Sequence, residues 1–357
     1  MIENTSPLQR YVRVLIADDS PTVRSHLASL MNNAAGLQVV GEARDGTEVL
    51  ALVPQLKPDV ISMDIHMPRM DGLEATRRIM MENPTPVVIV SGLLENDQEL
   101  SFQALQAGAL AVVEKPPDRN HPGFPDKHRQ LLKTLIAMSA VKVIRRGRTG
   151  LLTNDITQES VTILNRRIRT FPEIMVIGAS TGGPGAINNL LKRLPVLPIP
   201  IVVVQHMADE FINGLARWMG KSSGWSIRVA SDGAHLEPGV VHLSPGKAHL
   251  LVARQGKQLV ARLVNEPGDY RYQPAIDMLF RSVAATCGGA AIGLIMTGMG
   301  DDGADGLLAM RIAGARTFAQ DHSSSVVFGM PGAAIERGAV EEVLSLEQLP
   351  DAITRLL

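Results

Sequence analysis

The stretch IMVIGASTGGPG, residues 174–185, joins an apolar run to a glycine-rich turn that carries one serine, Ser180. The apolar run predicts a buried strand, and the glycines and Pro184 that follow predict a tight turn and the start of a helix. Such a turn exposes the serine hydroxyl at the edge of a sheet and points backbone N–H groups at the space in front of it. The stretch therefore predicts an α/β fold with a nucleophile at the end of a strand.

Two more polar residues follow apolar runs further along the chain. His206 comes directly after residues 201–205, and Asp302 follows the apolar stretch that begins at residue 292. The carboxyl ends of parallel strands meet at one sheet edge, so we expect the three side chains to converge. A hydroxyl, a base and a carboxylate are the groups of a nucleophilic hydrolase. Asp301 or Asp302 could instead cap the helix predicted over residues 304–313.

The glycine turn has a second reading, as a phosphate-binding loop at a helix start. The chain has neither the G-x-G-x-x-G spacing nor the Gly-Lys-Ser/Thr signature of nucleotide-binding loops at this point. Hydrolysis is therefore the favoured chemistry. The order serine, histidine, aspartate also differs from that of α/β-hydrolases, so that fold does not simply carry over.

The composition describes an ordinary globular protein. The 357 residues suffice for two domains, 45% of them are hydrophobic, and the net charge of −1 argues against nucleic acid as a partner. No apolar run of about 18 residues occurs and no apolar leader precedes residue 11, so we expect no membrane insertion. The single cysteine, Cys287, fits a reducing cytoplasm and is expected to be a buried bystander.

The first part of the chain, residues 11–143, alternates short apolar runs with amphipathic stretches, which predicts a doubly wound parallel sheet. The expected strands are 12–17, 37–43, 60–63, 87–91 and 111–114, and the expected helices are 21–32, 46–56, 72–82, 97–107 and 126–143.

Composition then changes. Residues 144–171 contain six arginines, and glycines interrupt the basic stretch. We interpret these residues as a linker that is either solvated or a docking site for the other domain or a partner. Residues 172–357 again alternate strands and helices and predict a second doubly wound α/β domain. Its middle part, residues 226–264, lacks helical periodicity and predicts a β-hairpin or a small antiparallel insertion.

Polar residues also follow the strands expected in the first domain, namely Asp18, Asp19, Asp64, Ser91 and Lys115. All five should project from one edge of the sheet. Clustered carboxylates repel one another unless a hard cation binds them, and Mg²⁺ accepts such oxygen ligands. A carboxylate beside Mg²⁺ can accept a phosphoryl group, and a lysine and a hydroxyl can hold the phosphoryl oxygens.

With DIHMPRMDG at residues 64–72 and EKP at 114–116, residues 11–143 resemble the CheY-like receiver domain of response regulators. The resemblance implies that Asp64 is the phospho-acceptor and that a histidine kinase is the phosphodonor. It implies an Mg²⁺ site formed by Asp18, Asp19, Asp64 and the His66 carbonyl, and contact with the phosphoryl group by Ser91 and Lys115. It also implies a cis Lys115–Pro116 bond.

Residues 172–357 resemble the catalytic domain of the CheB family of protein-glutamate methylesterases. The resemblance is carried by 177–183, QHM at 205–207, EPG at 237–239, LSPG at 243–246, TGMGDDG at 297–303 and FGMP at 328–331. It implies that Ser180 is the nucleophile, His206 the general base and then acid, and Asp302 the residue that orients His206. The backbone N–H groups of Thr181 and Met299 would form the oxyanion hole.

The resemblance implies a phosphorylation-activated esterase that demethylates glutamate methyl esters, and deamidates specific glutamines, on methyl-accepting chemotaxis receptors. No cofactor is expected for the esterase, and a monomer suffices. One departure is Asp209, in Ala208-Asp209, where the family usually has two prolines, and it adds a charge near His206. The alternative is a non-catalytic receiver-controlled binding module. A transcription factor would need a basic helix-turn-helix domain that the chain lacks.

Overall fold

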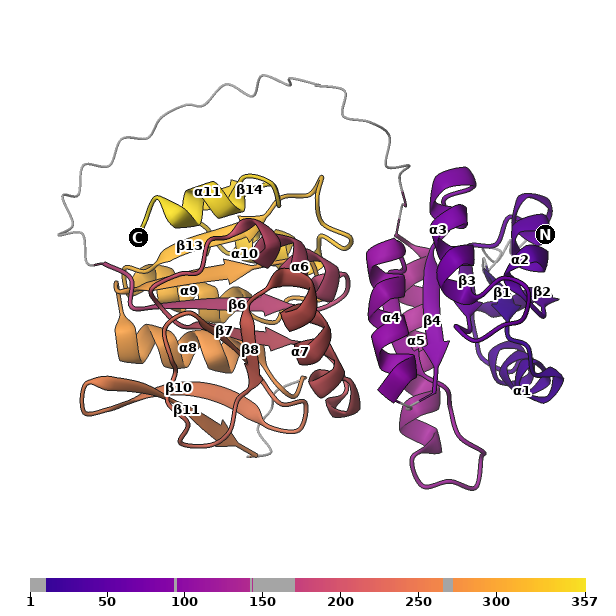
Figure 1. The fold of residues 1–357 in the computed structure, drawn as a ribbon, viewed down its shortest axis with the longest axis horizontal. Coiled ribbons are helices and arrows are strands. Elements are labelled where there is room, and N and C mark those ends of the chain that lie inside the picture. Colours follow the sequence, from indigo (N-terminus) through magenta and orange to yellow (C-terminus); the bar gives the residue numbers. More distant parts are fainter. Residues whose placement is uncertain (1–10, 93–94, 142, 144–170, 266–271) are drawn as a thin grey trace, which may run out of the picture.

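The computed structural model of this protein describes residues 11–92, 95–141, 143, 171–265 and 272–357. Figure 1 shows two α/β units, one built on each of two parallel sheets. The expected linker, residues 144–171, lies outside the described residues apart from residue 171. Among the described helices, none combines the length and the apolar character that crossing a membrane requires.

The first unit is a parallel sheet with strand order β2-β1-β3-β4-β5. This order reverses direction at β1, as in doubly wound folds that bind ligands at the carboxyl ends of their strands. Its strands are β1 (Val12–Ala17), β2 (Leu37–Ala43), β3 (Val60–Met63), β4 (Val87–Ser91) and β5 (Ala111–Glu114). Its helices are α1 (Pro21–Asn32), α2 (Gly46–Leu56), α3 (Gly72–Glu82), α4 (Glu95–Ala107) and α5 (Phe124–Ser139).

The strand bounds agree with the sequence-based prediction, but α5 does not. It was expected over residues 126–143 and instead begins at Phe124 and ends at Ser139. The backbone N–H groups of Ala140 and Val141 donate to the carbonyls three residues back, those of Ala137 and Met138. These bonds form a tighter 3₁₀-type turn, which ends the α-helix.

The central strands of this sheet are buried on both faces. Leu15 and Ile61 belong to one apolar cluster, while Val14 and Ile16 belong to the cluster on the other face. Helices must therefore cover both sides, which is why the strands read as continuous apolar runs in the sequence.

The second unit is a larger parallel sheet with strand order β14-β13-β12-β6-β7-β9-β8. Its strands are β6 (Ile174–Ala179), β7 (Ile201–Gln205), β8 (Ser226–Val229), β9 (Val240–Leu243), β12 (Ala291–Ile295), β13 (Arg316–Gln320) and β14 (Glu342–Leu344). Its helices are α6 (Gly183–Arg193), α7 (Asp209–Ser223), α8 (Ile276–Cys287), α9 (Ala304–Ile312), α10 (Gly329–Glu336) and α11 (Leu349–Thr354).

Strand order again locates a site. On one side of β6 lie β7, β9 and β8, in that spatial order, and on the other side lie β12, β13 and β14, which come later in the chain. The carboxyl ends of β6, β7 and β12 therefore surround the point where the direction of winding reverses, which is where open α/β sheets bind ligands.

The antiparallel insertion exists but is smaller than expected. Of residues 226–264, only β10 (His249–Gln255) and β11 (Gln258–Val264) form the antiparallel hairpin, visible below the main sheet in Figure 1. The first part of the region, β8 and β9, joins the main sheet as parallel strands. Their short length hid the parallel pairing from a reading based on periodicity.

The two units touch through helices α4 and α7, which face each other in Figure 1. Phe102 of α4 is fully buried and stacks on Trp218 of α7, with ring centroids 5.4 Å apart. Leu105 and Val112 of the first unit pack against the same apolar core of the second. Val326 and Val327 of the second unit pack in turn against a core cluster of the first.

Candidate active site

Strand register brings Ser180, His206 and Asp302 to one sheet edge. Ala179 pairs with Gln205 in adjacent strands, so the next residues, Ser180 and His206, are neighbours. The backbone N–H of His206 donates to the Ala179 carbonyl over 3.0 Å. On the other side, the Ser180 N–H donates to the Thr297 carbonyl over 3.0 Å, which joins the serine turn to the end of β12.

Glycine is required around the serine because other groups approach closely. A Cβ on Gly183 would lie 2.1 Å from the side-chain oxygen of Gln205, and one on Gly298 would lie 2.8 Å from the Ser180 Cβ. Gly182 has φ +78°, in the left-handed region that favours glycine. These three glycines let the turn fold tightly against its neighbours.

His206 and Asp302 form the polar pair expected of a base and its orienting carboxylate. The imidazole Nε2 lies 2.8 Å from Asp302 Oδ2, and the His206 side chain is 11% exposed. The other nitrogen, Nδ1, is buried and has no hydrogen-bond partner within the described part of the chain. If Nε2 carries the proton that Asp302 accepts, Nδ1 presents a lone pair that can take a proton.

Asp302 is held as an anion by its surroundings. Its carboxylate accepts hydrogen bonds from the backbone N–H groups of Ile276 (2.8 Å) and Asp277 (3.0 Å), at the start of α8. Burial opposes its charge, but the bond to His206 and the two amides hold the pKa of Asp302 below its usual value. An ionised carboxylate at this place favours a proton on His206 Nε2.

Capping by an aspartate occurs, but not as expected. Asp302 caps α8, because its carboxylate accepts from the Ile276 N–H. In α9, the helix that follows Asp302, the Gly306 N–H donates to the carboxylate of Asp277, a residue of α8. Asp301 instead accepts a hydrogen bond of 2.8 Å from Arg337. We call this arrangement the exchange of helix caps: an aspartate in or beside each helix accepts from the N–H groups of the other helix. The sequence does not reveal it because the partners are 25 or more residues apart.

Thr181 and Met299 flank the serine turn, as an oxyanion hole requires. Neither N–H donates in the backbone hydrogen bonds of the described residues outside helices and strands. Thr297 ties the two segments together, because its hydroxyl donates to the Thr181 carbonyl over 2.9 Å. The Met299 side chain is 49% exposed beside the site.

Two residues at this site were missed by the sequence reasoning. The Gln205 side-chain amide donates to the Ser180 carbonyl (2.8 Å) and to the His206 carbonyl (3.1 Å). Tyr272 stacks on the His206 ring with centroids 4.7 Å apart. Gln205 could have been noticed as a polar residue ending a buried strand, whereas nothing in the sequence near Tyr272 indicates its contact.

Three further titratable residues of the second unit, Cys287, His242 and His249, are partly or fully buried. Burial raises the pKa of Cys287 to about 12, which suppresses the thiolate and agrees with a bystander role. His242 accepts a hydrogen bond from the Glu237 N–H, and His249 accepts one from the Ala275 N–H. Among the described residues, neither belongs to a cluster that could hold a metal ion.

The Asp209 charge beside the site is compensated. Asp209 forms an ion pair of 2.8 Å with Lys247 and accepts a hydrogen bond from the Gly246 N–H. The hydrogen bond from Lys247 lowers the pKa of Asp209. The residue therefore clamps the loop before β10 onto the start of α7.

The first unit places Asp18, Asp19 and Asp64 together at its own sheet edge. One oxygen of each lies within 4.8 Å of the others, an arrangement that suits a divalent cation with oxygen ligands. Burial, together with the Asp18 charge, raises the pKa of Asp64, although Lys115 acts in the opposite direction. A bound cation would relieve this cost, so the donor set fits Mg²⁺.

Lys115 contacts two of these carboxylates, and Ser91 ends the neighbouring strand β4. Lys115 Nζ lies 2.8 Å from Asp18 and 3.0 Å from Asp64. Burial works against its charge, but these contacts hold the pKa of Lys115 above its usual value. The Ser91 hydroxyl is buried without a hydrogen-bond partner among the described residues. The Lys115–Pro116 bond is not cis; the cis bond of the described chain is Gln273–Pro274.

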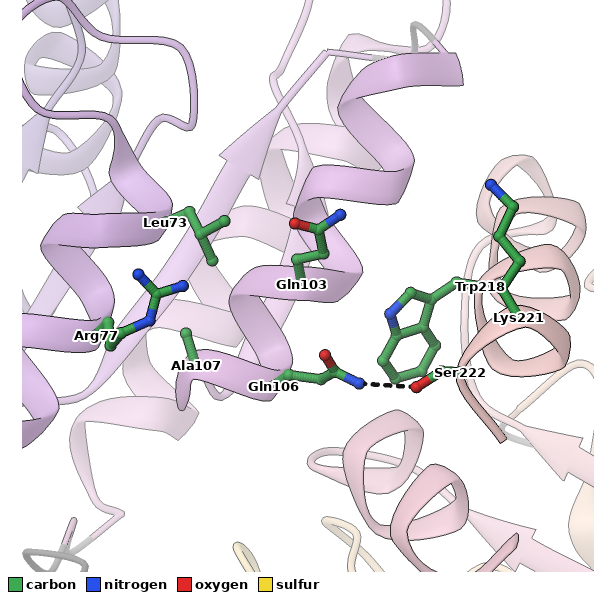
Figure 2. Close-up of a pocket in the computed structure, with 8 residues that line it drawn as sticks. All are labelled: Leu73, Arg77, Gln103, Gln106, Ala107, Trp218, Lys221 and Ser222. Carbon is green, nitrogen blue, oxygen red and sulfur yellow. Dashed lines mark hydrogen bonds between the residues drawn. The ribbon is translucent and has the colours of Figure 1, made fainter. Parts of the chain in front are cut away.

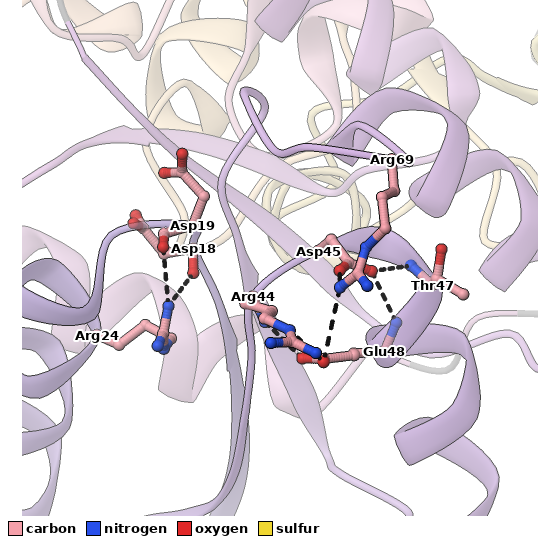
Figure 3. Close-up of polar contacts among 8 residues, drawn as sticks. All are labelled: Asp18, Asp19, Arg24, Arg44, Asp45, Thr47, Glu48 and Arg69. Carbon is pink, nitrogen blue, oxygen red and sulfur yellow. Dashed lines mark hydrogen bonds and ion pairs between the residues drawn. The ribbon is translucent and has the colours of Figure 1, made fainter.

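Figure 3 shows how the acidic edge is framed. Arg24 donates to the backbone carbonyls of Asp18 (2.8 Å) and Asp19 (3.1 Å), and so makes no use of their carboxylates in these bonds. The buried Asp45 is used differently, since it caps α2 and pairs with Arg69. Asp45 therefore does not belong to the cation site.

Two known protein families match the sequence of this chain. The CheB methylesterase family matches residues 175–353, and the response regulator receiver domain matches residues 14–121. The protein-glutamate methylesterase/protein-glutamine glutaminase 4 of Myxococcus xanthus (strain DK1622) is 44% identical over 344 residues, covering 96% of each chain. A protein of the same name, numbered 3, from Anaeromyxobacter dehalogenans (strain 2CP-C) is 44% identical and covers 96% of this chain and 97% of its own.

A solved structure resembles the second unit. The crystal structure of the Thermotoga maritima CheB methylesterase catalytic domain is 34% identical, with a TM-score of 0.51, and covers 53% of this chain and 100% of its own.

Proposed function

This chain belongs to the CheB methylesterase family, and we propose that Ser180, His206 and Asp302 hydrolyse glutamate methyl esters on methyl-accepting chemotaxis receptors. The observation that carries the proposal is the convergence of these residues. His206 bonds Asp302 through Nε2, its Nδ1 has no hydrogen-bond partner among the described residues, and it lies next to the turn that bears Ser180.

The proposed reaction begins with attack of Ser180 Oγ on the ester carbonyl. His206 takes the serine proton at Nδ1, and the Thr181 and Met299 N–H groups stabilise the oxyanion. His206 then gives the proton to the leaving methoxide, and methanol departs. Asp302 stabilises the imidazolium that exists between these two transfers.

Water completes the cycle. His206 accepts a proton from the water that attacks the acyl-enzyme, then returns it to Ser180 as glutamate is released. With a receptor glutamine as substrate, the same steps release ammonia and leave glutamate. Each step uses residues of this chain and requires no cofactor.

We further propose that Asp64 accepts a phosphoryl group from a chemotaxis histidine kinase. A receiver domain implies Mg²⁺-dependent phosphorylation, and Asp18, Asp19 and Asp64 would hold the ion, which would neutralise charge on the phosphoryl donor. Ser91 and Lys115 would then bind the transferred phosphoryl oxygens. The unpartnered Ser91 hydroxyl supports this role.

We assign residues 11–143 to the receiver, 144–171 to a linker and 172–357 to the catalytic domain. In the resting protein the receiver would hinder the esterase, and phosphorylation would weaken the contact between them. Two contacts between the receiver and the second unit support this regulation. Lys127 of the receiver lies 3.5 Å from Glu210 of α7, and Val326, whose side chain abuts Gly182, packs against the receiver core.

The contact between α4 and α7 leaves a cavity next to its aromatic stack. This cavity of about 450 Å³ is lined by Arg77, Gln106, Trp218 and Lys221 among others (Figure 2), and Trp218 is also the residue that stacks on Phe102. One hydrogen bond of 3.1 Å, from Gln106 to Ser222, crosses it. We propose that a monomer in the cytoplasm suffices for this switch.

The decisive experiment measures methanol release from methylated chemoreceptor membranes by the wild type and by Ser180→Ala. Each protein is assayed with and without a small phosphodonor and Mg²⁺. We expect release that requires Ser180 and increases with the phosphodonor. No release by the wild type, with Asp64 phosphorylation intact and across a panel of receptors, would favour a non-catalytic binding module.

A second comparison tests the regulation. A fragment of residues 165–357 should be faster than the resting full-length protein in a steady-state esterase assay. Equal rates would count against inhibition by the receiver.

A further inference from the structure

His206 is fixed by hydrogen bonding at only one of its ring nitrogens. Nε2 is bound to Asp302, while Nδ1 has no partner among the described residues. One such bond leaves the ring able to turn about that contact, because the second side-chain torsion of histidine is broad. A turned ring would move Nδ1, the atom proposed to take the Ser180 proton, so another contact must define the plane of the ring.

Tyr272 supplies a contact of this kind. Its ring lies nearly parallel to the imidazole, with 13° between the planes and 4.7 Å between the centroids. Its other end lies over Gly300, where a Cβ would be 3.0 Å from the tyrosine hydroxyl oxygen. The ring therefore spans the base and the loop that carries Asp302.

The backbone around Tyr272 is itself held in place. The side-chain amide of Gln273, the next residue, donates to the Lys247 carbonyl over 2.9 Å. The Ala275 N–H donates to the buried His249 over 3.0 Å, and the following N–H binds Asp302. Tyr272 is thus anchored to the same segment that fixes the carboxylate.

We propose that Tyr272 is a positioning residue for the hydrolysis. Its ring holds the His206 plane so that Nδ1 faces Ser180, and its π face stabilises the imidazolium formed when Nδ1 takes the serine proton. Tyr272 exchanges no atom with the substrate. This inference rests on the proposed function of Ser180 and His206.

The test compares Tyr272→Leu with Tyr272→Phe in the full-length protein, with phosphodonor and Mg²⁺. Two substrates are used, methylated receptor membranes and the small ester p-nitrophenyl acetate. We expect Tyr272→Leu to lower kcat about tenfold on both substrates with KM changed less than about twofold. Tyr272→Phe keeps the flat ring and should stay within about threefold of wild type.

Controls separate this role from others. Tyr11→Leu, at a half-exposed tyrosine of the receiver, should not alter either activity. Equal thermal midpoints and equal Asp64 phosphorylation rates show that the variants fold, and Tyr272→Met is a second non-aromatic variant if leucine is not tolerated.

Three results would overturn the inference: wild-type kcat in Tyr272→Leu, loss of activity in Tyr272→Phe equal to that in Tyr272→Leu, or a raised KM for receptors with p-nitrophenyl acetate unaffected. The last would make Tyr272 a substrate contact. Ser180→Ala is assayed in parallel. If that variant keeps wild-type activity, the proposed function fails independently of Tyr272.

Discussion

Gln205 shows how much of the proposed chemistry depends on one side chain that touches no substrate. Its amide binds the backbone carbonyls of both Ser180 and His206, and it is 2% exposed. The side chain therefore fixes the spacing between the proposed nucleophile and base. The Gln205 side chain can lie there because Gly183 has no Cβ.

Gly183→Ala should disturb this spacing. The new Cβ would meet the Gln205 oxygen at 2.1 Å and the Ala179 Cβ at 2.8 Å, so the amide must shift. We expect a loss of about 1–3 kcal/mol in the free energy of unfolding, measured with urea, and at least a tenfold loss of esterase activity, roughly the cost of overpacking a core.

Gly185→Ala is the matched control two residues later. A Cβ there meets nothing within 4 Å, so alanine should be neutral or stabilise the helix by up to about 1 kcal/mol. Equal effects of the two alanines would contradict the close approach at Gly183.

Asp302→Asn tests the orientation of the base. An amide cannot favour the His206 tautomer as a carboxylate does, so kcat for methanol release should fall by roughly 10³–10⁴. Asp301→Asn is the control, because Asp301 is paired with Arg337 rather than His206 and should keep near-wild-type activity. Similar losses in both variants would count against Asp302 as the orienting residue.

At the scale of elements, sequence reasoning worked where each strand is short, apolar and followed by polar residues. The runs before Asp18 and Asp64 predicted the bounds of β1 and β3 and the polar residues that meet at this sheet edge. The run before Ser180 predicted a buried strand, which is β6. β8 and β9 were not recognised as members of the main sheet, because parallel pairing depends on partners distant in the chain.

Tyr272 and the exchanged caps of α8 and α9 escaped prediction for the same reason. Asp302 lies 25 residues beyond Asp277, and His206 and Tyr272 meet only because separate elements converge. Local pattern carries no information on such contacts. The end of α5 was misplaced because residues 140–143 continue its apolar periodicity.

The acidic edge of the receiver should reduce stability when no cation is present. A carboxyl group whose pKa is raised on folding destabilises the folded state above that pKa and has no effect below its unfolded value. The pKa of Asp64 is raised by burial and by Asp18. Asp64→Asn should therefore raise the thermal midpoint at pH 7 in EDTA.

The pH and Mg²⁺ dependence provides the check. The advantage of Asp64→Asn should shrink as pH falls toward about 4, where Asp64 becomes protonated in both states. Added Mg²⁺ should also narrow the difference, because it stabilises the wild-type carboxylates. Calorimetric midpoints that favour the wild type in EDTA at pH 7 would refute this account.

At the scale of the whole molecule, the receiver and the catalytic domain share an apolar core. Phe102 belongs to the receiver helix α4 but is buried among side chains of the catalytic domain. Burial of an aromatic ring stabilises a contact by a few kcal/mol, enough to bias the two domains strongly toward association.

Phe102→Ala should therefore weaken the resting contact and raise the esterase activity of the unphosphorylated protein by at least about tenfold. The phosphodonor should then add less activity than it does in the wild type. Met81→Ala, at an exposed position of α3, is the control and should leave both rates unchanged. Unaltered resting activity in Phe102→Ala, with normal Asp64 phosphorylation, would argue against regulation through this contact.

The exchange of helix caps has a consequence for how this enzyme could decay over evolutionary time. Asp302 stabilises the fold in addition to its proposed role beside His206, since its carboxylate accepts from two N–H groups in the first turn of α8. Among the described residues, the structure gives the Ser180 hydroxyl no comparable structural hydrogen bond. A descendant released from selection for hydrolysis would lose the serine freely while retaining the aspartate for stability. In such a lineage the aspartate would be an uninformative marker of activity, and the serine the diagnostic one.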